Sequence, residues 1–333
     1  MKILTKIIKD NYDSRNNAIV LIKFLAILMI TNSHLDCEYG HFNFIARGGA
    51  LGNCLFFFAS GFTLFLGRFN LDFFNWYKRR VSRIIPAIIV LSCIVYWLSN
   101  VNFSIPKLLE EYWFLTCILV YYIPLYFIRK YLVDYLKYVF ALCLIIAIAA
   151  NFIIHDNSIF DMYYNLPYMR VHYFLFMLLG SIMAMSKNKE EGQKWHVMTN
   201  LVLFVLSFVL YLLLVWLCQR NQLLCKNQFV TLFPLLFSVY FCWNLSNCPF
   251  LVNFVHRPLC GRIIYFVSTL SLEVYIIQGL YFIGMFNGQY FPLNIIVIFG
   301  LLFLSSYILK ILSNMFIQLF GEQTFNWKKM IQV

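Results

Sequence analysis

The sequence consists of long apolar runs separated by short polar segments. Each run is about 20 residues long, which carries an α-helix through about 30 Å of hydrocarbon. The runs are apolar on every face, whereas a membrane β-barrel shows segments of about ten residues that alternate between polar and apolar positions. We therefore predict an all-α integral membrane protein, a bundle of about ten transmembrane helices. The predicted spans are 18–35, 50–67, 84–100, 112–128, 137–154, 170–186, 199–217, 229–247, 263–284 and 292–313.

Composition excludes a water-soluble protein. The chain has 333 residues, of which 62% are apolar and only 12% are charged, whereas soluble domains are about 25% charged. The first apolar run is too long for a signal peptide, and no small-residue cleavage site follows it. We therefore expect this run to remain in the protein as its first span.

The positive charges are distributed asymmetrically between the two sides of the predicted bundle. The formal net charge is +12, from 26 Lys and Arg residues. Nineteen of the 26 lie in alternate polar segments, five lie in the intervening ones, and two lie inside spans. This asymmetry follows the positive-inside rule. It predicts that both termini are cytoplasmic, and it accounts for the charge without nucleic-acid binding.

The spans form one predicted unit, a single transmembrane domain over residues 1–333 without a separate soluble domain. No linker rich in Pro, Gly or Ser and no internal repeat interrupts them. The basic stretch 68–83 is expected to be an inner loop or an interfacial helix. In the helical case, Trp76 and Tyr77 would anchor it at headgroup depth.

The cysteines and histidines do not indicate a metal site. Most of the ten cysteines lie within predicted spans, where a thiol behaves as a small apolar group. Cys218 and Cys225 lie toward the outer side with Cys37, and their spacing leaves a Cys218–Cys225 disulfide open. No group of His, Cys and Asp residues has a recognisable ligand spacing, so we expect no metal.

Three ionisable residues inside predicted spans are candidates for function, because charge is expensive in a bilayer. They are Lys23, His34 and Glu273. Lys23 and His34 share the first span and are separated by a helix rise of about 16 Å. Two plainer interpretations remain open: Lys23 extends to the inner headgroups, and His34 is only an interfacial residue.

Two further motifs follow in the first ninety residues. The second span contains FFFASG at 56–61, and the basic stretch ends in KRRVSRIIP at 78–86. Arg80 and Arg83 are three residues apart, which places both on one helix face, where they can hold phosphate oxygens. Alternatively, the basic run serves topology alone, and the small residues Ser60 and Gly61 serve close helix packing.

Together these motifs resemble those of the acyltransferase family 3 membrane enzymes. That family has an Arg or Lys followed, after ten intervening residues, by a His in its first span, as in Lys23 and His34. Its second span has Phe-Phe-x-x-Ser-Gly, as at 56–61, and its next inner segment has Arg-x-x-Arg, as in Arg80 and Arg83. The resemblance extends over about 15–320.

Weaker similarities lie farther along the chain. YWFLTCILVYYIPLY from Tyr112 and FLFMLLGSIMA from Phe174 resemble two further spans of the family. LSLEVYIIQG near Leu270 resembles its late span, which often ends in His where this chain has Gln278. We therefore assign Gln278 no catalytic role.

The resemblance implies a membrane O-acyltransferase. Such an enzyme moves an acyl group, in the first place acetyl, from cytoplasmic acyl-coenzyme A to a hydroxyl of a surface polysaccharide or lipid-linked glycan. It implies a bacterial cytoplasmic membrane, donor binding by Arg80, Arg83 and Ser60, and His34 as general base, since imidazole titrates near neutral pH. Lys23 either contacts the donor or pairs with Glu273.

The residues that would meet the acceptor are less clearly marked. Asp36 orients His34 only if the helix has ended, because positions i and i+2 do not share a helix face. The other substrate candidates are Glu111, Arg170, His172 and Glu273. Direct transfer and an acyl-histidine intermediate are both chemically open, as is the oligomeric state.

The main alternative is a transporter or flippase for a glycan or lipid-linked sugar. Transporters often show corresponding half-repeats and spans broken by Gly or Pro near the middle of the membrane. Neither is evident in the sequence. A membrane scaffold would explain the spans but not the intramembrane Lys23 and His34.

Overall fold

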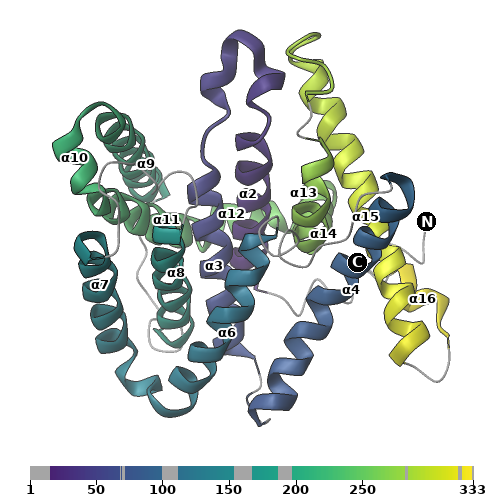
Figure 1. The fold of residues 1–333 in the computed structure, drawn as a ribbon, viewed down its shortest axis with the longest axis horizontal. Helices are drawn as coiled ribbons and strands as arrows, with labels where there is room; N and C mark the ends of the chain where they lie inside the picture. The colour runs from purple at the N-terminus through teal and green to yellow at the C-terminus, as the bar shows by residue number, and fades with distance from the viewer. Residues whose placement is uncertain are drawn as a thin grey trace.

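The computed structural model describes residues 16–67, 69, 72–99, 112–153, 167–186, 197–281, 284–321 and 325–331, and these residues form helices without a strand (Figure 1). The helices are α2 (Asn17–Ser33), η1 (Asp36–Ile45), α3 (Gly49–Leu66), α4 (Phe73–Ser99), α6 (Trp113–Tyr131), η2 (Val133–Tyr135), α7 (Leu136–Ile153), α8 (Pro167–Ser186), α9 (Val197–Arg220), α10 (Gln222–Lys226), η3 (Gln228–Thr231), α11 (Leu232–Ser246), α12 (Pro249–Val255), α13 (Pro258–Thr269), α14 (Ser271–Ile277), η4 (Gln278–Tyr281), α15 (Leu293–Gly321) and α16 (Trp327–Ile331).

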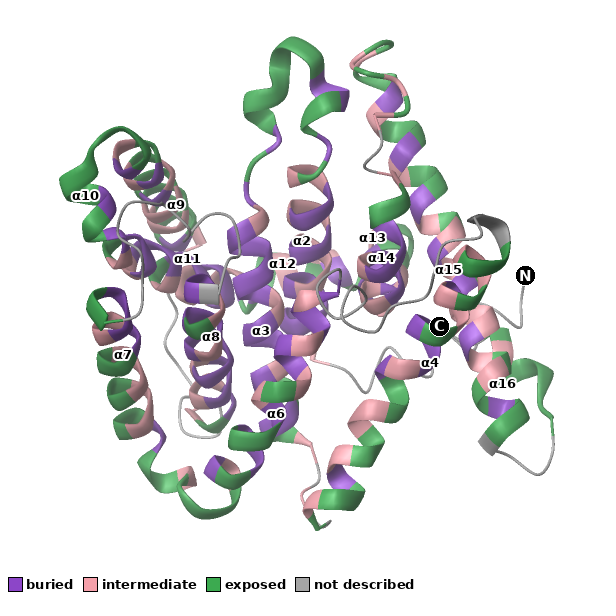
Figure 2. Ribbon diagram, in the orientation of Figure 1, coloured by how far each residue is buried: buried purple, intermediate pink, exposed green. Residues whose placement is uncertain are grey.

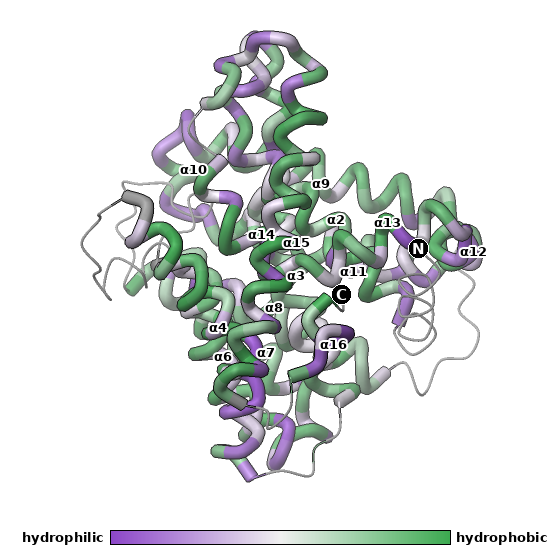
Figure 3. Tube along the Cα trace, turned by 90° about the vertical axis from the view of Figure 1, so that its right-hand side faces the viewer, coloured by the Kyte–Doolittle hydropathy of each residue, from purple (hydrophilic) through white to green (hydrophobic). Residues whose placement is uncertain are grey.

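The described helices confirm an all-α multi-pass membrane protein. Eight are long and apolar enough to cross a membrane, and the number rises to ten if each of two bent pairs is one span. Figure 3 shows hydrophobic residues along most of the long helices, with hydrophilic stretches gathered in the connecting segments. The bent pairs are α2 with η1, at 107°, and α13 with the helix that follows it, at 57°.

Two predicted segments differ from the structure. The basic stretch is helical from Phe73, and it continues into the third span as one helix, α4, so a loop is excluded for 73–83. The predicted span 263–284 is instead broken at Leu270, where α13 ends and α14 begins. A broken span is therefore present, although the sequence does not reveal it.

Helix α3 is the centre of the bundle, with α2 packed on one side and α8 on another (Figures 1 and 2). Its span is 78% buried, whereas that of the peripheral helix α9 is 17% buried. Gly61 of α3 and Gly180 of α8 allow the two backbones to touch. A side-chain carbon on Gly61 would overlap the carbonyl of Met177, and one on Gly180 would overlap the carbonyl of Phe58.

The segments η1 and 284–294 form a cap at one end of the bundle (Figure 1). Glu38 of η1 is buried, and its carboxylate accepts hydrogen bonds from the backbone N–H of Phe286 at 3.1 Å and from the Asn294 side chain at 3.4 Å. Asn294 also donates to the Glu38 carbonyl at 2.7 Å. These bonds connect the start of the chain to α15 over more than two hundred residues.

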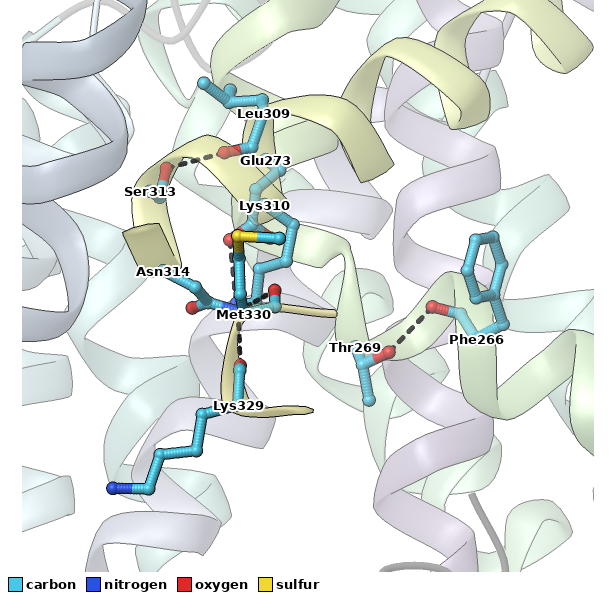
Figure 4. Close-up of polar contacts among 9 residues, drawn as sticks. All are labelled: Phe266, Thr269, Glu273, Leu309, Lys310, Ser313, Asn314, Lys329 and Met330. Carbon is cyan, nitrogen blue, oxygen red and sulfur yellow. Dashed lines mark hydrogen bonds and ion pairs between the residues drawn. The ribbon is translucent and has the colours of Figure 1, made fainter. Parts of the chain in front are cut away.

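An ion pair between a half-buried lysine and a buried carboxylate holds α14 against α15 (Figure 4). Lys310 of α15 donates to Glu273 of α14 at 2.8 Å, and only 2% of the Glu273 side chain is exposed. In an apolar bundle a carboxylate needs such a partner, because an uncompensated buried charge loses its hydration energy. The pair therefore anchors α14 immediately after the break at Leu270.

We expect Gly61→Ala to lower the free energy of unfolding by about 1–3 kcal/mol, because the added methyl must push α8 away from α3. The control is Gly300→Ala within α15, where a side-chain carbon would meet nothing within 4 Å. This variant should be neutral or slightly stabilising, since Ala favours helix over Gly. Thermal unfolding in detergent measures both, and equal melting temperatures would contradict the packing role.

We expect Lys310→Met to destabilise the protein by about 3–5 kcal/mol, because it leaves the Glu273 carboxylate buried without a cation. The double variant Lys310→Met with Glu273→Gln removes both charges and should recover most of that loss. A double-mutant cycle on melting temperature tests the pair. Additive effects of the two single substitutions would show that the ion pair does not stabilise α14.

Candidate functional site

A cavity of about 670 Å³ lies where α2 begins, α3 ends and the basic part of α4 passes both. Its wall carries four cationic side chains, Lys23 from α2 and Arg79, Arg80 and Arg83 from α4. No carboxylate occurs among the described residues that line it. Asn16, Thr63 and Ser268 add polar groups to the same wall.

Helical geometry explains how α4 presents its arginines. Arg80 and Arg83 are three residues apart and Arg79 and Arg83 are four apart, so the three occupy neighbouring positions on one side of the helix. The guanidinium of Arg80 lies over the Trp76 ring, 5.4 Å from its centroid. This contact fixes Arg80 beside the cavity, while Arg79 and Arg83 remain exposed.

Trp76 is not the headgroup anchor that the sequence suggests. Its side chain is 3% exposed, and its ring packs against those of Tyr122 and Tyr126 of α6. The prediction fails because α4 turns this position toward α6, and such a contact between separate spans leaves no local pattern. Tyr77 is half-buried, and its hydroxyl donates to the carbonyl of Leu119 at 3.3 Å.

The electrostatic character of the cavity is that of a polyanion site. Four positive charges around one space attract phosphate groups, and guanidinium forks form charge-assisted hydrogen bonds with phosphate oxygens. The sequence predicts donor binding by Arg80, Arg83 and Ser60 and offers Lys23 as a further donor contact. Arg80, Arg83 and Lys23 line the cavity, and Arg79 joins them there. Lys78, the first residue of the basic motif, does not line it.

The residues of the FFFASG motif make helix-packing and side-chain contacts, and none of them lines the cavity. Gly61 serves the packing of α3 on α8, and Phe57 stacks on Tyr173 at 4.9 Å. The Ser60 hydroxyl lies 3.4 Å from that of Tyr122, and Ser60 is not among the residues that line the cavity. The cavity instead receives Thr63, almost one turn farther along α3.

His34 lies at the other end of α2 from the cavity. It is the first residue after the helix, its backbone N–H donates to the Thr31 carbonyl at 3.1 Å, and its side chain is exposed. The helix has therefore ended before Asp36, which is the condition for this carboxylate to act on His34. The Asp36 carboxylate itself accepts a hydrogen bond from the Cys37 backbone N–H at 2.9 Å.

Gln278 contacts α2 one turn before His34. Its side-chain carbonyl accepts a hydrogen bond from the Thr31 hydroxyl at 3.3 Å, and both residues are buried. The residue that we assign no catalytic role thus connects η4 to the end of α2. Its partner could not be foreseen, because the two positions are 247 residues apart.

The substrate candidates do not form one cluster. Arg170 lies over the Trp113 ring at 5.5 Å. His172 is fully buried, with its Nδ1 2.9 Å from the Tyr168 carbonyl, so it does not face an open entrance. Glu111 lies outside the described residues. Glu273 has Lys310 as its salt-bridge partner, which is not the Lys23 pairing considered from the sequence.

The cysteines form no disulfide between Cys218 and Cys225. Neither thiol is joined to another cysteine, and Cys218 donates a hydrogen bond to the Leu224 carbonyl at 3.4 Å. In the described part of the chain no three His, Cys, Asp or Glu side chains are grouped to hold a metal ion.

Sequence reasoning missed polar residues that the fold brings into place. Asn16 and Ser268 line the cavity from α2 and α13, and Glu38 secures the cap beyond His34. Asn16 also caps α2 by accepting from the Ala18 backbone N–H at 3.0 Å, a role that Asn favours. Glu38 has no such local signal, because its partners Phe286 and Asn294 are about 250 residues away in the sequence.

Comparison with known proteins agrees with the helices and the motifs. No curated protein and no solved structure matches the chain. A family model does match, that of the acyltransferase domain of acyltransferase family 3, and it covers residues 16–315. The match includes the cavity with its four cations, His34 and the cap. Because this family model covers nearly the whole sequence, the chain belongs to acyltransferase family 3, as a multi-pass membrane acyltransferase.

Proposed function

We propose that the protein is an O-acetyltransferase that moves acetyl from cytoplasmic acetyl-coenzyme A to a hydroxyl of a surface polysaccharide or lipid-linked glycan. The observation that carries the proposal is the cavity in which Lys23, Arg79, Arg80 and Arg83 converge. Coenzyme A bears its negative charges on the phosphates of its nucleotide end. Those phosphates match the four cations, whereas the pantetheine arm and thioester are neutral.

The donor would bind with its nucleotide in the cavity and its arm directed along α2. Lys23 lines the cavity, and His34 lies eleven residues farther on, a helix rise of about 16 Å. A donor with its charge at one end and its reactive carbonyl at the end of a long arm suits this separation. Smaller donors such as acetyl phosphate lack that reach.

His34 would act as the general base. The imidazole takes the proton of the acceptor hydroxyl, whose oxygen then attacks the thioester carbonyl. The C–S bond breaks, acetyl becomes an ester on the acceptor, and the thiolate of coenzyme A receives the proton back from the imidazolium. Asp36 stabilises the imidazolium electrostatically, and Lys23 contacts the donor phosphates at the other end of α2.

The proposed location is the cytoplasmic membrane of a bacterium, with both termini inside. The charge asymmetry of the sequence supports this orientation. In this orientation the cavity would lie at the cytoplasmic face, where acetyl-coenzyme A is made, and the cap beyond His34 would lie at the opposite face, where a surface glycan is met.

A glycan transporter or flippase is the second candidate, and the broken span at Leu270 favours it. Transporters place such discontinuous helices at their binding sites. In this protein the break is 57°, and it adjoins the Glu273–Lys310 pair. A transporter would move its glycan without consuming acetyl-coenzyme A, so acetyl transfer by purified protein decides between the two.

We expect the double substitution Arg80→Gln and Arg83→Gln to weaken coenzyme A binding by about ten- to hundredfold, because each removes a charged hydrogen-bond donor. The matched control is Lys78→Gln, in the same basic motif but outside the cavity wall. Titration of detergent-purified protein with coenzyme A measures both. Equal affinity in the double variant and the control would remove the donor assignment.

We expect His34→Ala to lower kcat by about 10²- to 10⁴-fold, the usual contribution of a positioned general base. Coenzyme A affinity should stay near the wild-type value, because His34 does not line the cavity. Transfer of radiolabelled acetyl to cell-envelope glycans, with membranes at matched expression, provides the measurement. Retained transfer would exclude His34 as the base.

A further inference from the structure

Arg129 differs from the other basic residues at its end of the bundle in what it contacts. It lies in the last turn of α6, and its guanidinium donates through Nη1 to the Leu64 carbonyl and through Nη2 to the Gly67 carbonyl. It also lies over the rings of Phe65, at 5.6 Å, and Phe69, at 4.5 Å. Arg129 thus contacts both backbone carbonyls and aromatic rings at the end of α3.

The end of α3 needs such a partner. The last carbonyls of a helix have no intrahelical donor, and together they carry the negative end of the helix dipole. Gly67 ends α3 in an extended conformation, and its N–H donates to the Thr63 carbonyl at 3.2 Å. The Leu64 and Gly67 carbonyls accept from Arg129 instead. The planar guanidinium supplies both bonds at once, which the single ammonium of Lys does not do in the same geometry.

The same end of α3 forms part of the cation-lined cavity. Leu66 and Gly67 belong to its wall. The guanidinium of Arg80 lies against this segment, since a side-chain carbon on Gly67 would be 3.9 Å from Arg80 Nη2. Without a covering cation, the helix would direct its partial negative charge toward a space built for phosphate groups. Arg129 donates hydrogen bonds to the Leu64 and Gly67 carbonyls at this end.

We propose that Arg129 is a positioning residue of the donor site, one that fixes the Leu66–Gly67 wall and masks the negative end of α3 so that phosphate can approach Arg80. This inference rests on the proposed function of the cavity. It adds a residue of α6 to a site otherwise formed mainly by α2, α3 and α4. Arg129 acts through the wall and is not among the residues that line the cavity.

The neighbouring Lys130 provides a matched control. It carries the same charge at the next position, but it is exposed, and its ammonium lies over the rings of Tyr126 and Tyr131. Arg129→Gln and Lys130→Gln therefore remove equal charge from the same turn. Only the first removes the bonds to the end of α3. Arg129→Lys keeps the charge but loses the planar guanidinium, whose two nitrogens donate to the two carbonyls.

The experiment is titration of each purified full-length variant with coenzyme A, together with acetyl-transfer kinetics. We expect the coenzyme A Kd and the KM for acetyl-coenzyme A to rise about tenfold in Arg129→Gln and to change less than about twofold in Lys130→Gln. Arg129→Lys should fall between them. The kcat of all three should stay within about threefold of wild type, because His34 lies at the other end of α2.

Each outcome bears on the proposal. Equal Kd values for Arg129→Gln and Lys130→Gln would overturn it, as would a fall in kcat without a rise in KM. If Arg129→Gln does not fold, Arg129→Lys carries the test, and wild-type affinity in that folded variant would overturn the need for the fork. Wild-type protein that binds no coenzyme A would remove the donor function itself, a failure distinct from equal binding by the variants.

Discussion

The direct backbone contact between α3 and α8 is the constraint on which the other helices depend. In a bilayer no hydrophobic force drives helices together, so close packing through small residues must hold them. Gly61 and Gly180 provide that contact, and Gly52 provides a similar one to α2 through Ala26. With both neighbours in place, the end of α3 at Gly67 has a fixed position, and the cavity is built against it.

Charge in the bundle falls into two groups. Glu273 and Lys310 neutralise one another, and Arg129 is occupied by the carbonyls of α3. The four cations of the cavity instead share a space without a carboxylate among its described lining residues. Like charges brought close together repel one another, and water or an anion between them lowers that cost. A cluster of one sign at the edge of a membrane bundle is therefore stable where water or an anionic ligand reaches it.

Helix α2 connects the two ends of the site. Its beginning contributes Lys23 to the cavity, and its end presents His34 next to the cap that Glu38 secures. Gln278 holds the last turn of α2 through Thr31. The position of His34 relative to the cavity is thus set by a helix that is held near both ends.

The sequence by itself determined the class of fold and most of the spans, and it singled out three of the cations that line the cavity, Lys23, Arg80 and Arg83. It could do so because the bilayer imposes one strong local rule, a long apolar run for every crossing, and makes Lys23 and His34 conspicuous inside such a run. The Arg80 and Arg83 pair is likewise a local pattern, since helical spacing alone places both on one face.

Only the tertiary structure showed which residues that look alike in the sequence have different contacts. Trp76 looks like an interfacial anchor and is a buried contact of α6, and Arg129 looks like Lys130 and holds the end of α3. The break at Leu270 and the bonds of Glu38 are equally silent in the sequence. In each case the deciding partner lies in another helix or a distant segment, and hydropathy and spacing describe one segment at a time.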